Sequence, residues 1–81
     1  MDILVSGAST GLGRGISVHM AALGHTVWAG VRSEKAFIEV RKLNVRGLTP
    51  VYLDICDEDS IKSCMSEIRK KSGVLHALVN N

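Results

Sequence analysis

Residues 3–15, ILVSGASTGLGRG, constrain the fold more than any other part of the chain. A short apolar run leads into a turn whose glycines, Gly7, Gly11 and Gly13, have the spacing G-x-x-x-G-x-G, and a helical pattern follows. Glycines let backbone N–H groups approach an anion closely, and the positive end of a helix dipole favours negative charge. The stretch therefore predicts a strand, a turn and a helix, with a phosphate group bound where the helix begins.

The rest of the chain continues this alternation of strands and helices. Apolar or β-branched runs predict strands at residues 2–6, 25–31, 48–55 and 74–79. Apolar residues at helical spacing predict helices at residues 12–23, 34–44 and 57–72. Ser33 is the expected cap of the second helix, and Pro50 is expected near the start of the third strand. The order β-α-β-α-β-α-β predicts an α/β fold with a parallel sheet.

We expect residues 1–81 to be the N-terminal part of a single, incomplete domain. Of the 81 residues, 46% are hydrophobic and only 22% are charged, which suits strands buried on both faces better than a small free-standing domain. Four parallel strands need cover on both faces, and three helices are too few to supply it. The sequence therefore predicts a longer domain of which this chain is the front piece.

Composition excludes several other classes of function. The formal net charge is +2 and the basic residues form no long run, so we expect no nucleic-acid partner. There is no run of about 20 apolar residues and no signal-peptide pattern, so we expect a cytoplasmic protein with no transmembrane segment. Cys56 and Cys64 lack C-x-x-C spacing and suggest free thiols in a reducing compartment. The histidines His19, His25 and His76 fall in separate elements, so no metal site is expected.

Two familiar phosphate-binding motifs do not fit the first turn. A P-loop would end in Gly-Lys-Ser/Thr, whereas residues 13–15 read Gly-Arg-Gly. The dinucleotide fingerprint G-x-G-x-x-G is not matched literally either. A tight turn without a ligand is the alternative, although three glycines and two hydroxyls exceed what such a turn requires.

The chain resembles the short-chain dehydrogenase/reductase family over its whole length. Residues 6–13, SGASTGLG, resemble that family's T-G-x-x-x-G-x-G motif, with serine in place of the usual threonine. Asp54-Ile55 resembles the family's D-Φ pair, and Asn80-Asn81 resembles the first half of its N-N-A-G motif. The resemblance implies a Rossmann-type fold. It also implies an oxidoreductase that transfers hydride between a nicotinamide cofactor and a carbonyl or secondary alcohol.

The resemblance implies that the first turn binds the phosphate end of the cofactor. Gly7 would turn the chain off the first strand, and Gly13 would let the first helix pack close to the sheet. Ser9 and Thr10 would offer hydroxyls or amides to the ribose and phosphate. The pyrophosphate would receive backbone amides from Gly11 and Leu12.

The adenosine end is implied by the other two motifs. Asp54 would accept a hydrogen bond from the adenine amino group, and Ile55 would cover the edge of the ring. A carboxylate that caps the turn after the strand is the alternative role of Asp54. Asn81 would lie at the ribose, whereas Asn80 is expected to support the sheet. His76 departs from the family pattern, which often has aspartate there, and this puts one local contact in doubt.

The end of the second strand favours NADP(H) over NAD(H). An acidic residue there would bind both ribose hydroxyls and repel a 2′-phosphate, whereas an arginine accommodates the phosphate. Val31 occupies the acidic position and Arg32 follows it. A guanidinium beside a phosphate makes a charge-assisted pair. Arg32 could instead be an ordinary loop arginine, and Arg14 is a second candidate that we expect on the solvated face of its helix.

The catalytic serine and Tyr-x-x-x-Lys pair that the resemblance implies are absent from these 81 residues. Tyr52 is the only tyrosine and no lysine follows it at that spacing, so we assign it to the core or the sheet surface. We expect this chain to be inactive alone and the parent protein to be a homo-oligomer. Two alternatives remain: a non-catalytic dinucleotide-binding sensor, and a nucleotide-dependent transferase, which the pair Val31-Arg32 disfavours.

Overall fold

The computed structural model describes all of residues 1–81 and has the predicted alternation of strands and helices. The elements are β1 (Asp2–Val5), α1 (Gly11–Ala22), β2 (Thr26–Val31), α2 (Glu34–Lys42), β3 (Leu48–Tyr52), α3 (Glu58–Lys71) and β4 (Ala77–Val79). All strand pairs are parallel, and the order in the sheet is β3-β2-β1-β4. The predicted α/β fold with a Rossmann-type parallel sheet is confirmed.

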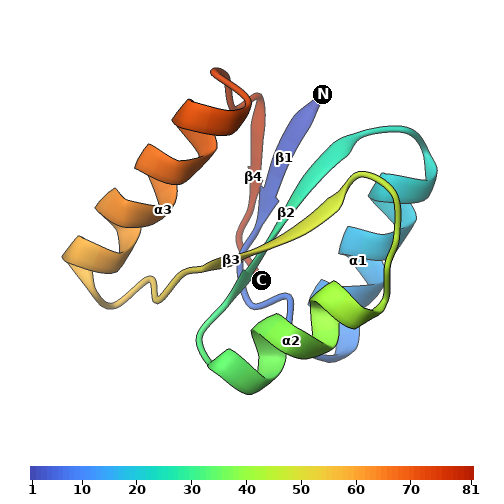
Figure 1. Cartoon of the computed structure of the whole chain (residues 1–81), viewed down its shortest axis with the longest axis horizontal. Helices are drawn as coiled ribbons and strands as arrows, with labels where there is room; N and C mark the ends of the chain where they lie inside the picture. The colour runs from blue at the N-terminus through green and yellow to red at the C-terminus, as the bar shows by residue number, and fades with distance from the viewer.

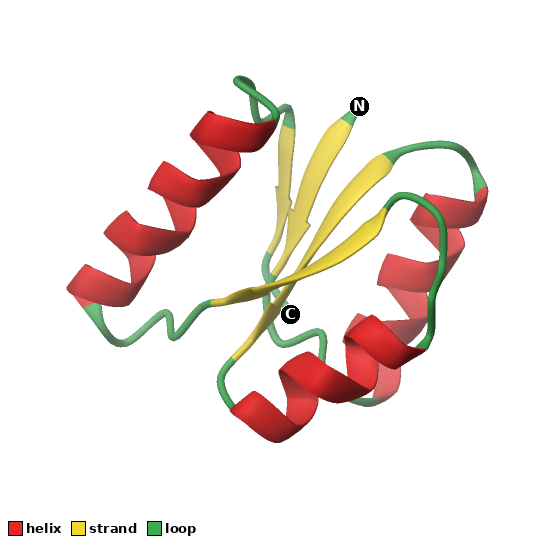
Figure 2. Ribbon diagram, in the orientation of Figure 1, coloured by secondary structure: helices red, strands yellow, loops and turns green.

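The sheet lies between two helical layers, with α1 and α2 on one face and α3 on the other (Figure 1). Successive residues of β2 alternate between the two faces. Val27 and Ala29 belong to the core under α1 and α2, whereas Trp28 belongs to the core under α3. Figure 2 shows the same layers by element type. Burial on both faces explains why the strands are nearly continuous apolar runs.

Small residues form the row of α1 that meets the sheet. Gly13, Ser17 and Ala21 are the buried residues of the helix, and they follow one another at intervals of four. Ile16 and Met20, which dominate the apolar pattern in the sequence, only flank this core. The Ser17 hydroxyl donates a hydrogen bond to the Gly13 carbonyl at 2.8 Å, which satisfies it inside the helix. The small row lets α1 lie close against the strands.

Pro50 lies in the middle of β3, not near its start as predicted. The strand is at the edge of the sheet and pairs only with β2. The amide of Leu53 donates to Val31 at 2.8 Å, and the carbonyl of Gly47 accepts from Val27 at 2.7 Å, so the odd-numbered residues of this segment bond to β2. The ring nitrogen of Pro50 therefore faces away from the sheet, where a missing N–H costs nothing.

The strands β3 and β4 are shorter than predicted. β3 ends at Tyr52, whereas the sequence pattern extended to residue 55, and β4 begins at Ala77, whereas the pattern began at residue 74. Beyond β3, the Asp54 carboxylate accepts a hydrogen bond from the Cys56 amide at 3.0 Å and closes a turn. Residues 54–55 consequently project from the carboxyl edge of the sheet and do not continue the strand.

The cover over the sheet is uneven at β4. Leu78 is opposite Leu4 in the strand register and shares its face. Leu4 is 3% exposed in the core under α3, whereas Leu78 is 61% exposed. The helix α3 therefore covers the middle of its face and leaves the β4 side open.

Candidate functional site

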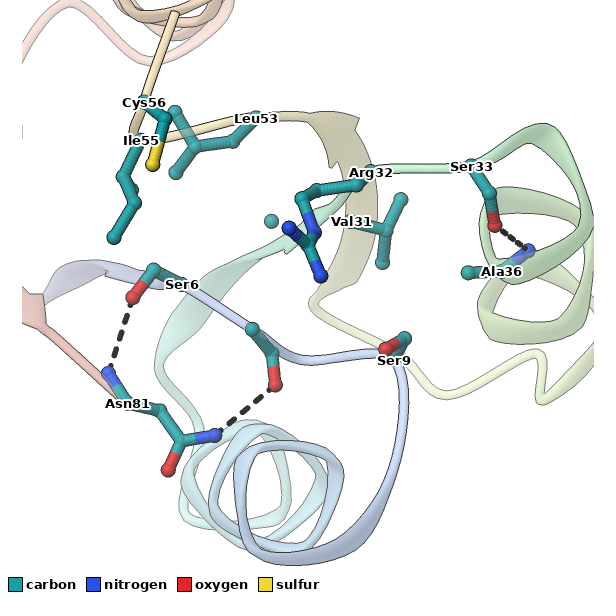
Figure 3. Close-up of a pocket in the computed structure, with 12 residues that line it drawn as sticks. Ser6, Ser9, Val31, Arg32, Ser33, Ala36, Leu53, Ile55, Cys56 and Asn81 are labelled. Carbon is teal, nitrogen blue, oxygen red and sulfur yellow. Dashed lines mark hydrogen bonds between the residues drawn. The ribbon is translucent and has the colours of Figure 1, made fainter.

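A cavity of about 450 Å³ lies at the carboxyl edge of the sheet. Segments that follow all four strands contribute to its lining, among them Gly7 after β1, Arg32 after β2, Ile55 after β3 and Asn81 after β4 (Figure 3). The chain proceeds from β1 through β2 to β3 on one side of the sheet, and β4 lies on the other side of β1. Ligands of open α/β sheets bind at such a switch point.

The first turn has a backbone that only glycine adopts easily. Gly7 and Gly11 have φ angles of +62° and +57°, in the left-handed region. The Ala8 amide donates to the Gly30 carbonyl at 2.9 Å, which fixes the turn to the end of β2. A Cβ on Gly13 would lie 2.2 Å from the Gly7 carbonyl oxygen. The close approach at Gly13 is thus between the helix and its own turn, whereas the prediction was close packing of the helix against the sheet.

The start of α1 differs from the starts of the other two helices. The Ser33 hydroxyl accepts from the Ala36 amide at the start of α2, and the Asp57 carboxylate accepts from the Asp59 amide at the start of α3. The N-cap residue of α1, Thr10, makes no such hydrogen bond, and the first turn of α1 has no acidic residue. The first amides of α1 thus lack a side-chain acceptor. Phosphate binding at this turn stays a prediction.

A buried serine ties the end of β4 to the first turn. The Ser6 hydroxyl is 3.1 Å from Asn80 Oδ1, to which it donates, and it accepts from the Asn81 amide at 3.1 Å. The side-chain amide of Asn81 donates to the Gly7 carbonyl at 3.1 Å (Figure 3). Asn80 thus supports the sheet, as expected, and Asn81 is held at the cavity.

The two arginines proposed for phosphate binding are in different surroundings. Arg32 is exposed, forms no ion pair and extends from the end of β2 into the cavity (Figure 3). The last residue of β2 is the buried Val31, so the end of this strand carries no carboxylate. Arg14 is only 31% exposed, and its Nη2 is 3.7 Å from Glu39 of α2. Arg14 therefore links two helices and does not line the cavity.

Asp54 performs the turn-capping role that the sequence left as an alternative. One carboxylate oxygen, Oδ1, accepts from the Cys56 amide, and the Asp54 amide donates to the Ser60 hydroxyl at 2.9 Å. The bond from Cys56 holds the carboxylate in place but leaves its other oxygen, Oδ2, without a protein partner. Ile55 is 54% exposed and lines the cavity. The geometry is compatible with both roles of Asp54.

Half of the predicted site residues line the cavity directly. These are Gly7, Ser9, Arg32, Ile55 and Asn81. The other five do not line the cavity. These are Thr10, Gly11 and Leu12, exposed at the start of α1, together with the buried Gly13 and the half-buried Asp54.

Seven further residues line the cavity that the sequence did not predict as site residues, namely Ser6, Gly30, Val31, Ser33, Ala36, Leu53 and Cys56. A Cβ on Gly30 would lie 3.0 Å from the Val5 carbonyl oxygen and 3.0 Å from Leu53 Cδ2. A glycine inside a buried strand was the available signal, because it often marks a close approach of neighbouring chain. Leu53 and Cys56 adjoin the Asp54-Ile55 pair, but nothing in their own types points to a ligand.

No group of three or more His, Cys, Asp or Glu side chains is placed to hold a metal ion. None of the helices has both the length and the apolar character needed to cross a membrane. Tyr52 was predicted in the core or on the sheet surface. It stacks on Phe37, with ring centroids 4.6 Å apart, and is 47% exposed, so it lies on the sheet surface.

Comparisons with known proteins agree on one family. The family model described as short chain dehydrogenase matches residues 2–81. The chain is 35% identical to the 3-oxoacyl-[acyl-carrier-protein] reductase FabG of Staphylococcus aureus, over 96% of this chain and 33% of the reductase. It is also 35% identical to estradiol 17-beta-dehydrogenase 2 of Mus musculus, over 98% of this chain and 22% of that protein.

A solved structure gives the same result for the fold. The crystal structure of a short chain dehydrogenase from Bacillus anthracis superposes with a TM-score of 0.88 at 26% identity. The match covers 99% of this chain and 33% of the other. The chain thus spans a third or less of the length of these proteins.

Proposed function

The chain belongs to the short-chain dehydrogenase family, and we propose that it is the NADP(H)-binding part of an oxidoreductase. The substrate class that we propose is a carbonyl compound or a secondary alcohol. The names of two relatives, a 3-oxoacyl reductase and an estradiol dehydrogenase, support this class. Residues 1–81 would form the N-terminal part of a single Rossmann domain, with the catalytic residues in the remainder of the protein.

One observation carries the proposal: the free N-terminus of α1, at a glycine turn beside the cavity. The two other helices have side-chain caps, whereas Thr10 leaves the first amides of α1 unbonded. Gly13 lets the helix start approach the turn. The first amides of a helix point toward an anion at its N-terminus. A pyrophosphate bound there would receive several backbone hydrogen bonds together with the favourable end of the helix dipole.

The remaining residues would orient the rest of the cofactor. Asn81 would contact the ribose, held by its bonds to Ser6 and Gly7. Asp54 would accept from the adenine amino group through its free oxygen while Ile55 covers the ring. The nicotinamide supplies the hydride chemistry when the cofactor is bound, and this chain contributes binding and orientation. We therefore propose that residues 1–81 have no activity alone.

The preference for NADP(H) is assigned to Arg32. Its guanidinium extends into the cavity and has no carboxylate partner. The residue before Arg32 is the buried Val31, at the position where a carboxylate would repel a 2′-phosphate. A charge-assisted hydrogen bond of this kind contributes about 1.5–3 kcal/mol. Arg14, by contrast, already has Glu39 as a partner.

The test is cofactor titration of the complete protein and its Arg32→Ala variant. Loss of Arg32 should weaken NADPH binding by about 10- to 100-fold and change NADH binding little, because only NADPH has the 2′-phosphate. Arg46→Ala is the matched control, since Arg46 is an exposed arginine that does not line this cavity. Unchanged NADPH affinity in the Arg32 variant would contradict the assignment, as would an equal loss for both cofactors.

Two other functions are separated by simple measurements. A sensor that binds the dinucleotide without catalysis would bind NADPH and oxidise none of it in the presence of carbonyl compounds. A transferase with an adenosyl cofactor would bind that cofactor and not NADPH. Membership of a dehydrogenase family and the presence of Val31, not an acidic residue, at the end of β2 both favour the oxidoreductase.

A further inference from the structure

The wall of the cavity that follows β3 is held only partly by the sheet. Leu53, Ile55 and Cys56 line the cavity (Figure 3), and Asp54 lies among them in the chain. The last backbone hydrogen bond from this segment to β2 is donated by the Leu53 amide to the Val31 carbonyl, at 2.8 Å. From Asp54 onward, the position of the wall therefore depends on contacts other than strand pairing.

Ser60 of α3 supplies such a contact. Its hydroxyl accepts a hydrogen bond from the Asp54 amide at 2.9 Å, and the Asp54 carbonyl accepts from the Asp57 amide at 3.0 Å. The helix is seated on the sheet by Cys64 and Ile68, which are each 1% exposed. Ser60 thus joins the backbone of Asp54 to an element whose own position is fixed by the core.

The hydrogen bond of the Asp54 side chain does not replace this contact. The Cys56 amide donates to Oδ1 of Asp54 at 3.0 Å, but the two residues are two positions apart and belong to the same turn. A bond of this kind gives the turn its shape and does not join it to the rest of the molecule. The orientation of the turn relative to the cavity therefore depends on Ser60.

We propose that Ser60 is a positioning residue for recognition of the adenine base. It holds Asp54 where the carboxylate can accept from the adenine amino group, and so makes the site prefer adenine to a base without that group. A hydrogen bond weakens steeply when its donor and acceptor move beyond about 3.2 Å or out of line, so a small shift of Asp54 is sufficient to lose it. The proposal rests on the cofactor-binding function proposed above, and Ser60 acts only through Asp54.

The test measures how the complete protein and its Ser60→Ala variant bind two cofactors. One is NADP⁺, and the other is nicotinamide hypoxanthine dinucleotide phosphate, which has a carbonyl oxygen in place of the adenine amino group. The wild type should prefer NADP⁺ by about 10- to 100-fold, the range for a hydrogen bond to a carboxylate. Ser60→Ala should reduce this preference by roughly three- to tenfold, through weaker binding of NADP⁺. A general loss of structure would weaken both cofactors alike and leave the preference unchanged.

Three further variants serve as controls. Ser60→Thr keeps the hydroxyl and should keep the wild-type preference. Ser63→Ala is the matched control, because Ser63 is an exposed serine of the same helix, and it should bind both cofactors as the wild type does. Asp54→Ala removes the carboxylate and should abolish the preference.

The outcomes separate the role of Ser60 from the proposed function. An unchanged preference in Ser60→Ala, together with a lost preference in Asp54→Ala, would overturn the role of Ser60 and leave the proposed function intact. An equal loss in Ser60→Thr and Ser60→Ala would also overturn it, since the hydroxyl would then not be responsible. A wild type that binds neither cofactor would refute the proposed function, and the role of Ser60 with it.

Discussion

The two cysteines are in contrasting positions. Cys56 is exposed at the rim of the cavity, whereas Cys64 is buried between α3 and the sheet. Burial raises the pKa of the Cys64 thiol above its ordinary value, and the nearby Glu67 carboxylate raises this pKa further. The thiolate is the reactive form of cysteine, so Cys64 is both inaccessible and held in its unreactive state.

Thiol labelling should therefore distinguish the two residues. At about pH 8 a thiol reagent should modify Cys56 rapidly and Cys64 only when the protein unfolds. Saturating NADP⁺ should slow the reaction of Cys56, because this residue lines the proposed site. The Cys56→Ser variant is the control and should lose the rapid phase. Similar rates for both thiols would contradict the burial of Cys64.

The raised pKa of Cys64 also determines how this residue makes the free energy of unfolding depend on pH. The folded protein keeps the Cys64 proton to a higher pH than the unfolded chain does. The contribution of this group to the free energy of unfolding is therefore fully present below the ordinary thiol pKa, and it is lost as the pH rises through the raised value of the folded state.

Individual site residues could be predicted where a residue type is tied to a local requirement. Ser33 was identified as a helix cap from its type and place, and the structure confirms it. Gly13 was identified from its spacing to Gly7. Leu53 and Cys56 were missed because their place at the cavity depends on how the ends of β2 and β3 meet, which no local pattern contains.

Two glycines of α1 allow a test of how closely this helix meets its own turn. A Cβ at Gly13 would lie 2.2 Å from the Gly7 carbonyl oxygen and 2.7 Å from Asn81 Nδ2, whereas a Cβ at Gly15 would have nothing within 4 Å. The two positions are two residues apart in the same helix. They therefore share the effect of alanine on helix formation and differ in the space available.

We expect opposite results for alanine at these two positions. Gly15→Ala should raise the free energy of unfolding by about 0.5–1 kcal/mol and leave NADPH affinity unchanged. Gly13→Ala should lower it by about 1–3 kcal/mol and weaken NADPH binding, because the turn and Asn81 must move. Chemical denaturation and cofactor titration of the complete protein measure both effects. A Gly13→Ala variant as stable as Gly15→Ala would contradict the close contact.

At the level of elements, the sequence predicted type and order better than boundaries. The alternation of short apolar runs with helical patterns was sufficient for the order of strands and helices. The end of β3 was missed because the turn made by Asp54 and Cys56 competes with continuation of the strand. The buried row of α1 was missed because hydrophobic periodicity emphasises large residues. Close packing against the sheet requires the small ones, Gly13, Ser17 and Ala21.

For the whole molecule, the parallel order places the ends of all four strands on the same side, and the site lies at this carboxyl edge. The spatial arrangement of the residues did not follow from the sequence pattern. Arg32 and Asn81 come from strands on opposite sides of β1, and only the folded sheet brings them to one cavity. The sequence predicted that three helices are too few to cover the sheet. It did not predict that the uncovered part lies at Leu78.

This uneven cover leads to a prediction for the isolated chain. Leu78 is 61% exposed, and the outer edge of β4 has no partner strand. Such an edge promotes association between chains, and a small core gives only marginal stability. Residues 1–81 expressed alone should therefore unfold with poor cooperativity or aggregate, as measured by thermal and urea unfolding with light scattering. The complete protein is the control, and a sharp, reversible, two-state transition of the isolated chain would refute the prediction.

The first amides of α1 have no capping side chain, and a cap added there would have opposite effects on stability and on the proposed phosphate binding. A side chain that capped this helix would stabilise the free protein by about 1 kcal/mol, as caps do elsewhere. It would do so by occupying the amides that a phosphate needs, and a carboxylate there would also repel that phosphate. A substitution at Thr10 that capped α1 would therefore raise stability. The new side chain would compete with the proposed phosphate for the same amides. Substitutions meant to stabilise the protein should therefore avoid this residue and be made at helix ends away from the proposed site.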